Sequence, residues 1–479
     1  MRKRRTVYFN DARHYYLFVY EPPMRMEDAW SAVDEVAGTA VDTFVYGVAR
    51  DDGLFYPSKV GMRFGEDIQP FDTVPYWRLW HNMQSLLDRG LDPLTVLIDR
   101  AHAKGMDFIA SLRLGGYGRM PEDWMVSKGG RGFVHAEVRD HQFAVLQELA
   151  TQYATEGVEL DLAAPPAGSS FCLKSEDAPE YTPVMTDFVR RVADMVRKRP
   201  GKAGLVGARV YPTEELNRKS GLDVRAWLSE GLVDYVVPMF YGYFVLDANM
   251  PIEWLIKAAH EHDVSAYAML QPYSSDESRR EGVMHATPAM MRAAAANFWD
   301  LGVDGLYTWF FAWPLGDSER RTLTELGDPD LIRNQDKHYF LRWRSTYDED
   351  YPALLPMEIE SADRKRRYQI PFRLADDTAD DHLHSLTLRI GVGNTVTHDK
   401  YEVLLNGTPL ARESCSRNYM SNHVPYFGQW LEFRLQTIRP RKGENLLEIS
   451  LLERPDDFEA SVTIEALEIV VQYGMYPVE

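Results

Sequence analysis

Short runs rich in β-branched and aromatic residues alternate with helical stretches along the chain as far as about residue 340. There are eight such runs, at 6–10, 41–48, 106–114, 157–162, 204–211, 233–241, 265–270 and 303–311. Strands separated by helices are typical of a parallel sheet, and this number fits a closed barrel better than an open doubly wound sheet. No glycine-rich dinucleotide fingerprint follows any of the runs. The sequence therefore predicts an α/β fold, a (β/α)₈ TIM barrel, over residues 1–345.

Several predicted strands begin in the same way. A glycine precedes the strand in KGMDF, EGVEL, EGLVDY and LGVDGLY, as expected where a helix ends in a left-handed glycine. Asp107, Asp234 and Asp304 stand at these strand entrances, on the face of a barrel that serves stability. We expect a structural role for them.

The periodicity changes after residue 339. Runs such as LPMEIE, YQIPFRL, HSLTLRI, YEVLLNG, QWLEFRLQ, LLEISLLE and TIEALEIVVQY alternate apolar and polar residues. Asn406-Gly407 is a hairpin signal, and residues 442–445 (KGEN) mark another turn. After the polar linker WRSTYDEDYPALLP, the pattern predicts an all-β, jelly-roll-like sandwich over residues 346–479. This domain would bind carbohydrate or have a structural role.

Composition and charge exclude several classes of function. A net charge of -19 argues against nucleic acid, because phosphate contacts need clustered Lys and Arg. No apolar run reaches membrane-spanning length. The start, MRKRR, has the charge of a signal peptide, but no apolar segment follows it. We therefore expect a cytoplasmic protein, or a secreted one if a leader has been removed; whether it forms a homo-oligomer through the sandwich is left open.

No cofactor or metal is expected. The chain has 2 cysteines, Cys172 and Cys415, which are too few for a disulfide framework or a cysteine metal site. No His-x-x-x-His or Glu-x-x-His pair stands at a predicted strand end, and no G-x-S-x-G nucleophile motif occurs.

Polar side chains gather where the predicted strands end, which is the face that carries the chemistry of barrel enzymes. The candidate catalytic residues are carboxylates: Asp161 and Glu159 on the fourth strand, and Asp11 after the first. The candidate substrate-binding residues are Arg50, Arg113, His135, Arg209, Tyr211, Tyr241, Gln271, Trp309 and Trp313. Aromatic rings suit the C–H faces of sugars, and carboxylates suit the glycosidic oxygen. The combination predicts a glycoside hydrolase.

Glu159 and Asp161 share one face of the fourth strand because side chains alternate along a strand. If that face points into the barrel, Asp161 lies at the rim and Glu159 one layer deeper. A buried pair of like charges would raise one pKa, as a general acid requires. Alternatively, Glu159 pairs with Arg113 or Arg209 and only supports the architecture.

Other roles are left open by the residues alone. The second carboxylate is not fixed by spacing, since several lie near the rim: Asp11, Asp51, Asp52, Glu214 and Glu215. His135 would bind substrate, or it would cap or pack against the helix that follows. Arg50 and Arg113 would bind an acidic sugar, or they would neutralise neighbouring carboxylates.

The order of several motifs resembles that of bacterial glycoside hydrolase-like proteins of the family-10-like group. The motifs are VDTFVYGV with FYPSKVG, GLDPLTVLIDRAHAKGMDFIASLRL, HAEVRDHQ, EGVELDL, GLDVRAWLSEGLVDYVVP, and DGLYTWFFAWP followed by LGDP and DKHY. The resemblance implies a TIM-barrel glycosidase acting on a poly- or oligosaccharide, with the E-L-D element of the fourth strand near the reaction centre. Such proteins usually carry an aromatic residue and an arginine after E-L-D, whereas this chain has LAAPP at 162–166.

Two other functions compete with hydrolysis. The barrel and sandwich would together bind glycans without cleaving them, or the barrel would be a lyase for uronic-acid polymers, with Arg50 or Arg113 binding the carboxylate. Release of reducing ends separates hydrolysis from binding, and an absorbing unsaturated product would indicate the lyase.

Overall fold

The computed structural model describes residues 5–11, 16–50, 53–114, 125–127, 130–163, 178–201, 203–240, 244–279, 281–309, 314–345, 351–420 and 428–474. Two compact units divide the chain. The first comprises Met1–Tyr241, Pro251–Met269 and Val303–Gly327, and the second comprises Gly242–Met250, Leu270–Gly302 and Asp328–Glu479. Each unit thus draws on several stretches of the chain. The domain boundary between residues 345 and 346 stays a prediction.

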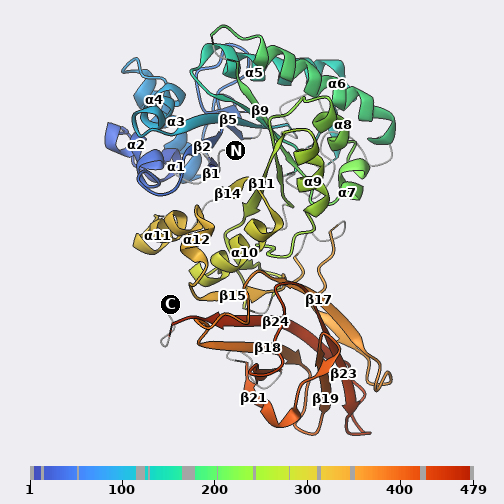
Figure 1. The fold of residues 1–479 in the computed structure, drawn as a ribbon. Helices are drawn as coiled ribbons and strands as arrows, with labels where there is room; N and C mark the ends of the chain where they lie inside the picture. Colours follow the sequence, from blue (N-terminus) through green and yellow to red (C-terminus); the bar gives the residue numbers. More distant parts are fainter. Residues whose placement is uncertain are drawn as a thin grey trace. The chain divides into compact units, whose positions relative to one another are not determined.

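The N-terminal part of the chain forms a closed barrel with the strand order β1-β14-β11-β10-β9-β8-β5-β2 (Figure 1). Its strands are β1 (Arg5–Asp11), β2 (Thr43–Gly47), β5 (Asp107–Arg113), β8 (Gly157–Asp161), β9 (Leu205–Val210), β10 (Tyr235–Pro238), β11 (Ser265–Leu270) and β14 (Gly305–Thr308). Each lies within or within one residue of a run predicted from the sequence. The TIM-barrel prediction is confirmed.

Helices connect these strands. In the first unit they are α1 (Tyr16–Val19), α2 (Met26–Asp34), α3 (Val74–Leu87), α4 (Pro93–Ala103), α5 (Ala136–Gln152), α6 (Ala178–Arg197), α7 (Glu214–Lys219), α8 (Val224–Ser229), α9 (Glu253–Glu261) and α11 (Asp317–Leu326). In the second unit they are α10 (Pro288–Leu301) and α12 (Pro329–Ile332). Local signals set their ends: Asp92 caps α4 by accepting from Leu94 N at 2.8 Å, and Gly302, with φ 87°, ends α10. These are the start and stop signals that the chemistry of helix ends favours.

Carboxylates at the strand entrances bind neighbouring strands. Asp234 accepts a hydrogen bond from Val206 N at 2.8 Å, and Asp304 accepts one from Ala266 N at 2.9 Å. Asp107 pairs with Arg5 at 2.7 Å. The Asp234 and Asp304 contacts join adjacent strands, and the Arg5–Asp107 pair links β1 to β5 past β2. All three lie at the end opposite the predicted site, as the sequence-based expectation of a structural role requires.

The second unit contains two large antiparallel sheets, which confirm the predicted β-sandwich, and a small two-stranded sheet of β12 (Tyr273–Ser275) and β13 (Met284–His285). One sheet has the order β15-β24-β18-β22-β21, with β16 also paired to β24, and the other has the order β17-β23-β19-β20. The strands are β15 (Lys337–Phe340), β16 (Met357–Ile359), β17 (Tyr368–Leu374), β18 (Ser385–Gly393), β19 (Lys400–Leu405), β20 (Thr408–Pro409), β21 (Cys415–Tyr419), β22 (Gly428–Arg434), β23 (Gly443–Glu453) and β24 (Val462–Gln472). The predicted Asn406-Gly407 turn joins β19 to β20 with φ values of 50° and 78°.

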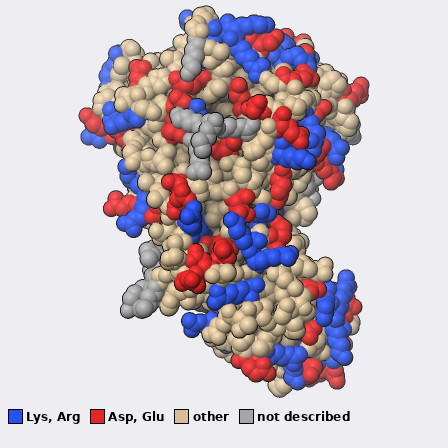
Figure 2. Space-filling view, viewed as in Figure 1, with Lys and Arg blue, Asp and Glu red and all other residues tan. Residues whose placement is uncertain are grey.

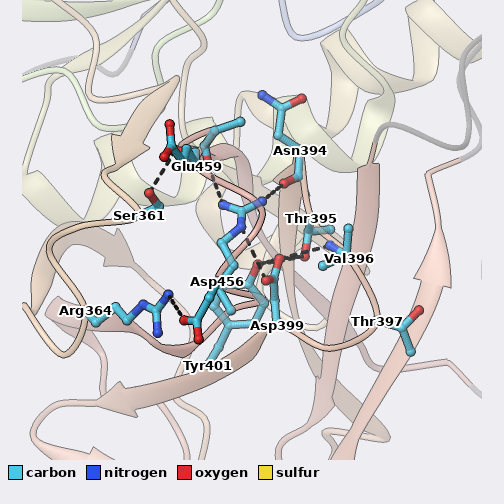
Figure 3. Close-up of polar contacts among 12 residues, drawn as sticks. Ser361, Arg364, Asn394, Thr395, Val396, Thr397, Asp399, Tyr401, Asp456 and Glu459 are labelled. Atoms are coloured by element: carbon cyan, nitrogen blue, oxygen red, sulfur yellow. Dashed lines mark hydrogen bonds and ion pairs between the residues drawn. The ribbon is translucent and has the colours of Figure 1, made fainter.

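A buried ion pair ties two loops of the sandwich together (Figure 3). Arg454 Nε lies 3.5 Å from Asp399 Oδ1, and both side chains are 0% exposed. The arginine also donates to the backbone carbonyls of Asn394 and Ala460. Asp399 Oδ2 accepts from Val396 N at 2.9 Å. The facing atoms, Arg454 Nε and Asp399 Oδ1, form no hydrogen bond with any residue that the structure describes, so the two buried charges are balanced by their proximity and by hydrogen bonds to their other atoms.

Charged side chains of both signs are interspersed over the face shown in Figure 2. Within the part of the chain that the structure describes, no helix has both the length and the apolar character needed to cross a bilayer.

Candidate active site

The side chain of Glu159, on β8, points into the barrel and is 0% exposed. Its Oε1 accepts hydrogen bonds from Ser111 Oγ at 2.8 Å and from Tyr307 OH at 2.9 Å. Its Oε2 accepts one from Tyr235 OH at 3.0 Å. Burial raises the pKa of both phenols well above the ordinary value, so they stay protonated and keep donating. Glu159 is therefore a buried carboxylate with donors on both oxygens.

A glycine makes room for one of these donors. A Cβ atom added at Gly207, on β9, would lie 2.0 Å from the ring of Tyr235. Any larger residue would therefore displace this phenol from Glu159. This is a close approach that only glycine allows without a shift of the ring.

Arg209, two residues further along β9, joins Glu159 to Asp161. Its Nε lies 2.9 Å from Glu159 Oε1, and its Nη2 lies 3.3 Å from Asp161 Oδ2. Nη2 also donates to Ser111 Oγ at 2.8 Å. Burial alone would lower the pKa of the guanidinium, but Asp161, Tyr307 and Glu159 raise it above its ordinary value. The arginine remains a fixed positive charge in the barrel interior.

Aromatic rings hold this guanidinium in place. It lies over the rings of Phe9 at 4.1 Å and Trp309 at 5.1 Å, and the two ring centroids are 4.6 Å apart. Ring faces are electron-rich and attract cations, more strongly in a desolvated interior. Trp309, predicted to bind substrate, thus lies beside the buried arginine.

The two carboxylate oxygens of Asp161, at the end of β8, have different surroundings. Oδ2 accepts a hydrogen bond from Arg113 Nε at 3.1 Å and also faces Arg209. Oδ1 is buried and has no hydrogen-bond partner among the residues that the structure describes. A buried acceptor left unsatisfied costs about 1–3 kcal/mol, and in native structures such an atom calls for an explanation.

Arg113 connects Asp161 to Asp11, at the end of β1. Arg113 Nη2 lies 3.8 Å from Asp11 Oδ2. Exposure of the side chains rises from 1% for Asp161 to 8% for Asp11 and 16% for Arg113. The cluster therefore approaches solvent on the side of Asp11 and Arg113.

This cluster brings together five of the predicted site residues. Asp11, Asp161, Glu159, Arg113 and Arg209 are linked by four ion pairs of 4.0 Å or less. With all five groups ionised, three negative and two positive charges leave the cluster with one net negative charge.

The other predicted site residues lie elsewhere or outside the described residues. Arg50 lies over the ring of Tyr76, 5.1 Å from its centroid. His135 is the N-cap residue of α5, but its side chain makes no capping hydrogen bond with the backbone of the helix. Tyr211 follows β9 and is buried, and Gln271 follows β11 and is buried in the second unit. Tyr241 and Trp313 lie outside the described residues, as do Asp51 and Asp52.

Two further rim carboxylates are paired at the surface. Glu214 accepts two hydrogen bonds from Arg225, at 2.8 and 2.9 Å, and Glu215 lies 2.9 Å from Lys219 Nζ. Within the part of the chain that the structure describes, no hydrogen bond or ion pair joins either of them to Asp161. They are thus weaker candidates for the second carboxylate than Asp11, which shares an arginine with Asp161.

Sequence reasoning missed four residues of the cluster: Phe9, Ser111, Tyr235 and Tyr307. A signal for three of them was present, because each lies two residues before a predicted site residue: Asp11, Arg113 and Trp309. Positions two apart on a strand share a face. Tyr235 carried no such signal, since its proximity depends on the space left by Gly207.

No protein-family model matches the sequence, and no curated protein matches it. Structural neighbours are bacterial glycoside hydrolases. They include α-L-fucosidase isoenzyme 2 of Paenibacillus thiaminolyticus, with a TM-score of 0.41, 12% identity and coverage of 69% of this chain and 49% of that one. A maltogenic α-amylase of Thermotoga neapolitana has a TM-score of 0.39 and 10% identity, with 96% and 98% of the two chains covered.

A cycloisomaltooligosaccharide glucanotransferase of Paenibacillus sp. has a TM-score of 0.36 and 6% identity. The match covers 97% of this chain and 57% of that one. The chain thus spans about half the length of two of these neighbours. Likeness at this level transfers neither an activity nor membership of the family-10-like group, which stays a prediction.

Proposed function

We propose that the protein is a glycoside hydrolase that cleaves a glycosidic bond of a poly- or oligosaccharide at the cluster around Asp161. The observation that carries the proposal is Oδ1 of Asp161, an ionisable, buried acceptor without a hydrogen-bond partner among the described residues. Its sister oxygen faces the guanidinium groups of Arg113 and Arg209, which hold the carboxylate in place. A fixed carboxylate with one oxygen that no donor occupies suits attack on an anomeric carbon or activation of a water.

Asp11 is the partner carboxylate that we assign to this reaction. Glycosidases commonly use two carboxylates on either side of the scissile bond. Asp11 is held by the same arginine as Asp161 and lies on the more exposed side of the cluster. In the proposal it exchanges a proton with the leaving group or the incoming water.

Glu159 has a positioning role in this scheme. Its oxygens accept from three hydroxyl groups and face Arg209, so it offers little room for proton transfer. It fixes Arg209, which in turn faces Asp161. This corresponds to the supporting alternative considered from the sequence rather than to a reacting carboxylate.

The net negative charge of the cluster favours hydrolysis over the lyase reaction. An oxocarbenium-like transition state carries positive charge, which surrounding carboxylates stabilise. A uronate substrate would instead need a cation available to bind it. Arg113 is engaged by Asp161 and Asp11, and Arg50 lies against Tyr76.

Release of reducing ends from a panel of neutral and acidic glycans tests the proposal. We expect the wild-type protein to hydrolyse at least one member, and Asp161→Asn to lower kcat by at least about 10³-fold, because the amide cannot act as a nucleophile or base. Asp223→Asn is the matched control. Asp223 caps α8 by accepting from Ala226 N at 3.0 Å, and Asn caps helices equally well.

Full activity of Asp161→Asn would contradict the assignment of the residue. Glycan binding without any turnover by the wild-type protein would favour the binding module, and an absorbing unsaturated product would favour the lyase.

A further inference from the structure

A cavity of about 170 Å³ lies at an edge of the sandwich. Its floor is apolar and comes from both sheets: Val403 of β19, Leu431 and Phe433 of β22, and Leu410 just after β20. These four side chains are each 8% exposed or less. Cys415 and Arg417 of the edge strand β21 complete the wall, with Tyr401 of β19. The pairing of β21 with β22 places Cys415 opposite Phe433 and Arg417 opposite Leu431.

The charged residues that line the cavity are all cationic: Lys400, Arg412 and Arg417. Arg417 is held in place by donating to the carbonyl of Asp399 at 2.6 Å, and it lies 5.5 Å from the centroid of the Tyr401 ring. Lys400 pairs with Glu453. Arg412 interacts electrostatically with the same carboxylate, but among the residues that the structure describes it forms no ion pair of 4.0 Å or less, so its guanidinium can contact a ligand.

From this arrangement we infer that the sandwich binds a small organic carboxylate with an apolar body, such as an aromatic acid. The carboxylate would face Arg412 and Arg417, and the body would rest on Leu410, Leu431 and Phe433. Charge complementarity selects an anion, and the buried apolar floor selects one with a hydrocarbon body over an inorganic ion. The inference concerns the sandwich alone and does not depend on the chemistry of the barrel.

The size of the cavity limits the ligand. A cavity of roughly 150 Å³ lined by apolar side chains is known to hold benzene, and this one measures about 170 Å³. A single six-membered ring therefore fits, with its carboxylate projecting to the cationic rim. Drug-sized ligands fill pockets of about 300–1,000 Å³, so the part of a ligand that enters this cavity is limited to about one ring.

Protection of Cys415 from alkylation tests the inference on the full chain. The cysteine lines the cavity and is half-buried, and Cys172→Ser leaves it as the only thiol. We expect millimolar benzoate to slow its reaction with iodoacetamide in a saturable way. Benzyl alcohol, benzylamine and inorganic phosphate, which lack the charge or the body, should protect far less.

Two arginine variants test whether the cationic rim of the cavity binds the carboxylate of the ligand. Arg412→Gln should weaken protection by benzoate about fivefold, in line with the loss of one partly exposed charge contact. Arg434→Gln is the matched control, because Arg434 is exposed at the end of β22 and does not line the cavity; it should leave protection unchanged. Thermal unfolding of each variant reports whether it is folded.

A different result would overturn the inference. Absence of protection by benzoate would show that the cavity takes no such ligand. Equal protection by benzyl alcohol would show that the cavity does not recognise the carboxylate charge, and equal protection by phosphate would show that the apolar floor does not contribute. Unchanged protection by benzoate in Arg412→Gln would show that the cationic rim does not bind the ligand.

Discussion

At the scale of single residues, the barrel interior depends on a few small or polar positions that let large side chains converge. Gly207 is the clearest case, because the ring of Tyr235 occupies the space that any Cβ would fill. Tyr235 in turn donates to Glu159, which faces Arg209. The arrangement of the charged cluster thus depends on the absence of a side chain at Gly207.

Replacing Gly207 with Ala tests this link. The ring of Tyr235 must move, so Glu159 loses a donor, and we expect a fall in the free energy of unfolding of about 1–3 kcal/mol. Turnover should fall as well, because Arg209 and Asp161 lose their support. Urea denaturation and kcat measure the two effects.

Tyr235→Phe is the matched comparison, since it removes only the hydroxyl group. We expect it to reproduce part of the loss in both measurements. If Gly207→Ala were as stable and as active as the wild-type protein, the packing of Tyr235 would not support the cluster.

The sequence could predict which residues of β8 face inward, because alternation along a strand follows from backbone geometry. It could not predict which arginine pairs with which carboxylate. Arg209 meets Ser111 across 98 positions of sequence, and that contact depends on the register of three strands. Spacing within one strand carries no information on that register.

At the scale of elements, the eight barrel strands followed from their composition and from the turns between them. The sandwich strands with clear alternation were also predicted. β15 (Lys337–Phe340) was missed, because it is short and carries a lysine at a buried position. Lys337 is 2% exposed and donates to Asp376 at 2.9 Å. The partner that allows this burial lies 39 positions away, outside the reach of a local pattern.

Glu468 of β24 provides an element-level test of pH dependence. Burial alone would raise its pKa, but the contact with His338 at 3.0 Å and the guanidinium groups of Arg389 and Arg279 lower the pKa below its ordinary value. A carboxylate with a lowered pKa in the folded state stabilises the fold above the unfolded pKa of about 4.3, and this contribution is lost as pH falls through the folded value.

Glu468→Gln should therefore lower the free energy of unfolding at pH 7 by about 1.5–3 kcal/mol, because hydrogen bonds to a charged group are lost. It should also flatten the loss of stability below about pH 4.3. Thermal unfolding at a series of pH values measures both. Glu459→Gln, on an exposed loop, is the control; a mutant curve parallel to that of the wild-type protein would exclude the contribution.

At the scale of the whole molecule, the sandwich depends on residues that precede the predicted boundary at 345/346. Lys337 and Tyr339 of β15 both donate to the buried Asp376, and β15 pairs with β24 along one edge of the sheet. A fragment of residues 346–479 would lack both of these donors and would keep a third, Tyr473 OH, which lies 2.7 Å from Asp376 Oδ1.

We expect a fragment of residues 328–479 to be more stable than one of residues 346–479, by at least about 3 kcal/mol, since breaking a buried ion pair costs about 3–5 kcal/mol. Urea denaturation of the two fragments measures the difference. Equal stability would contradict the importance of β15 and would support a folding boundary at 345/346.

The most direct test of the proposed function is rescue by azide of an enzyme that lacks the Asp161 carboxylate. In Asp161→Gly, an added azide ion can occupy the space of the missing side chain and attack the anomeric carbon, forming a glycosyl azide as the aglycone leaves with a proton from the acid group. We predict that azide restores turnover of an activated aryl glycoside by at least about tenfold and gives the glycosyl azide. Unchanged turnover in Asp161→Gly without azide would contradict the assignment of Asp161 as the reacting carboxylate, and so would rescue of Asp11→Gly alone.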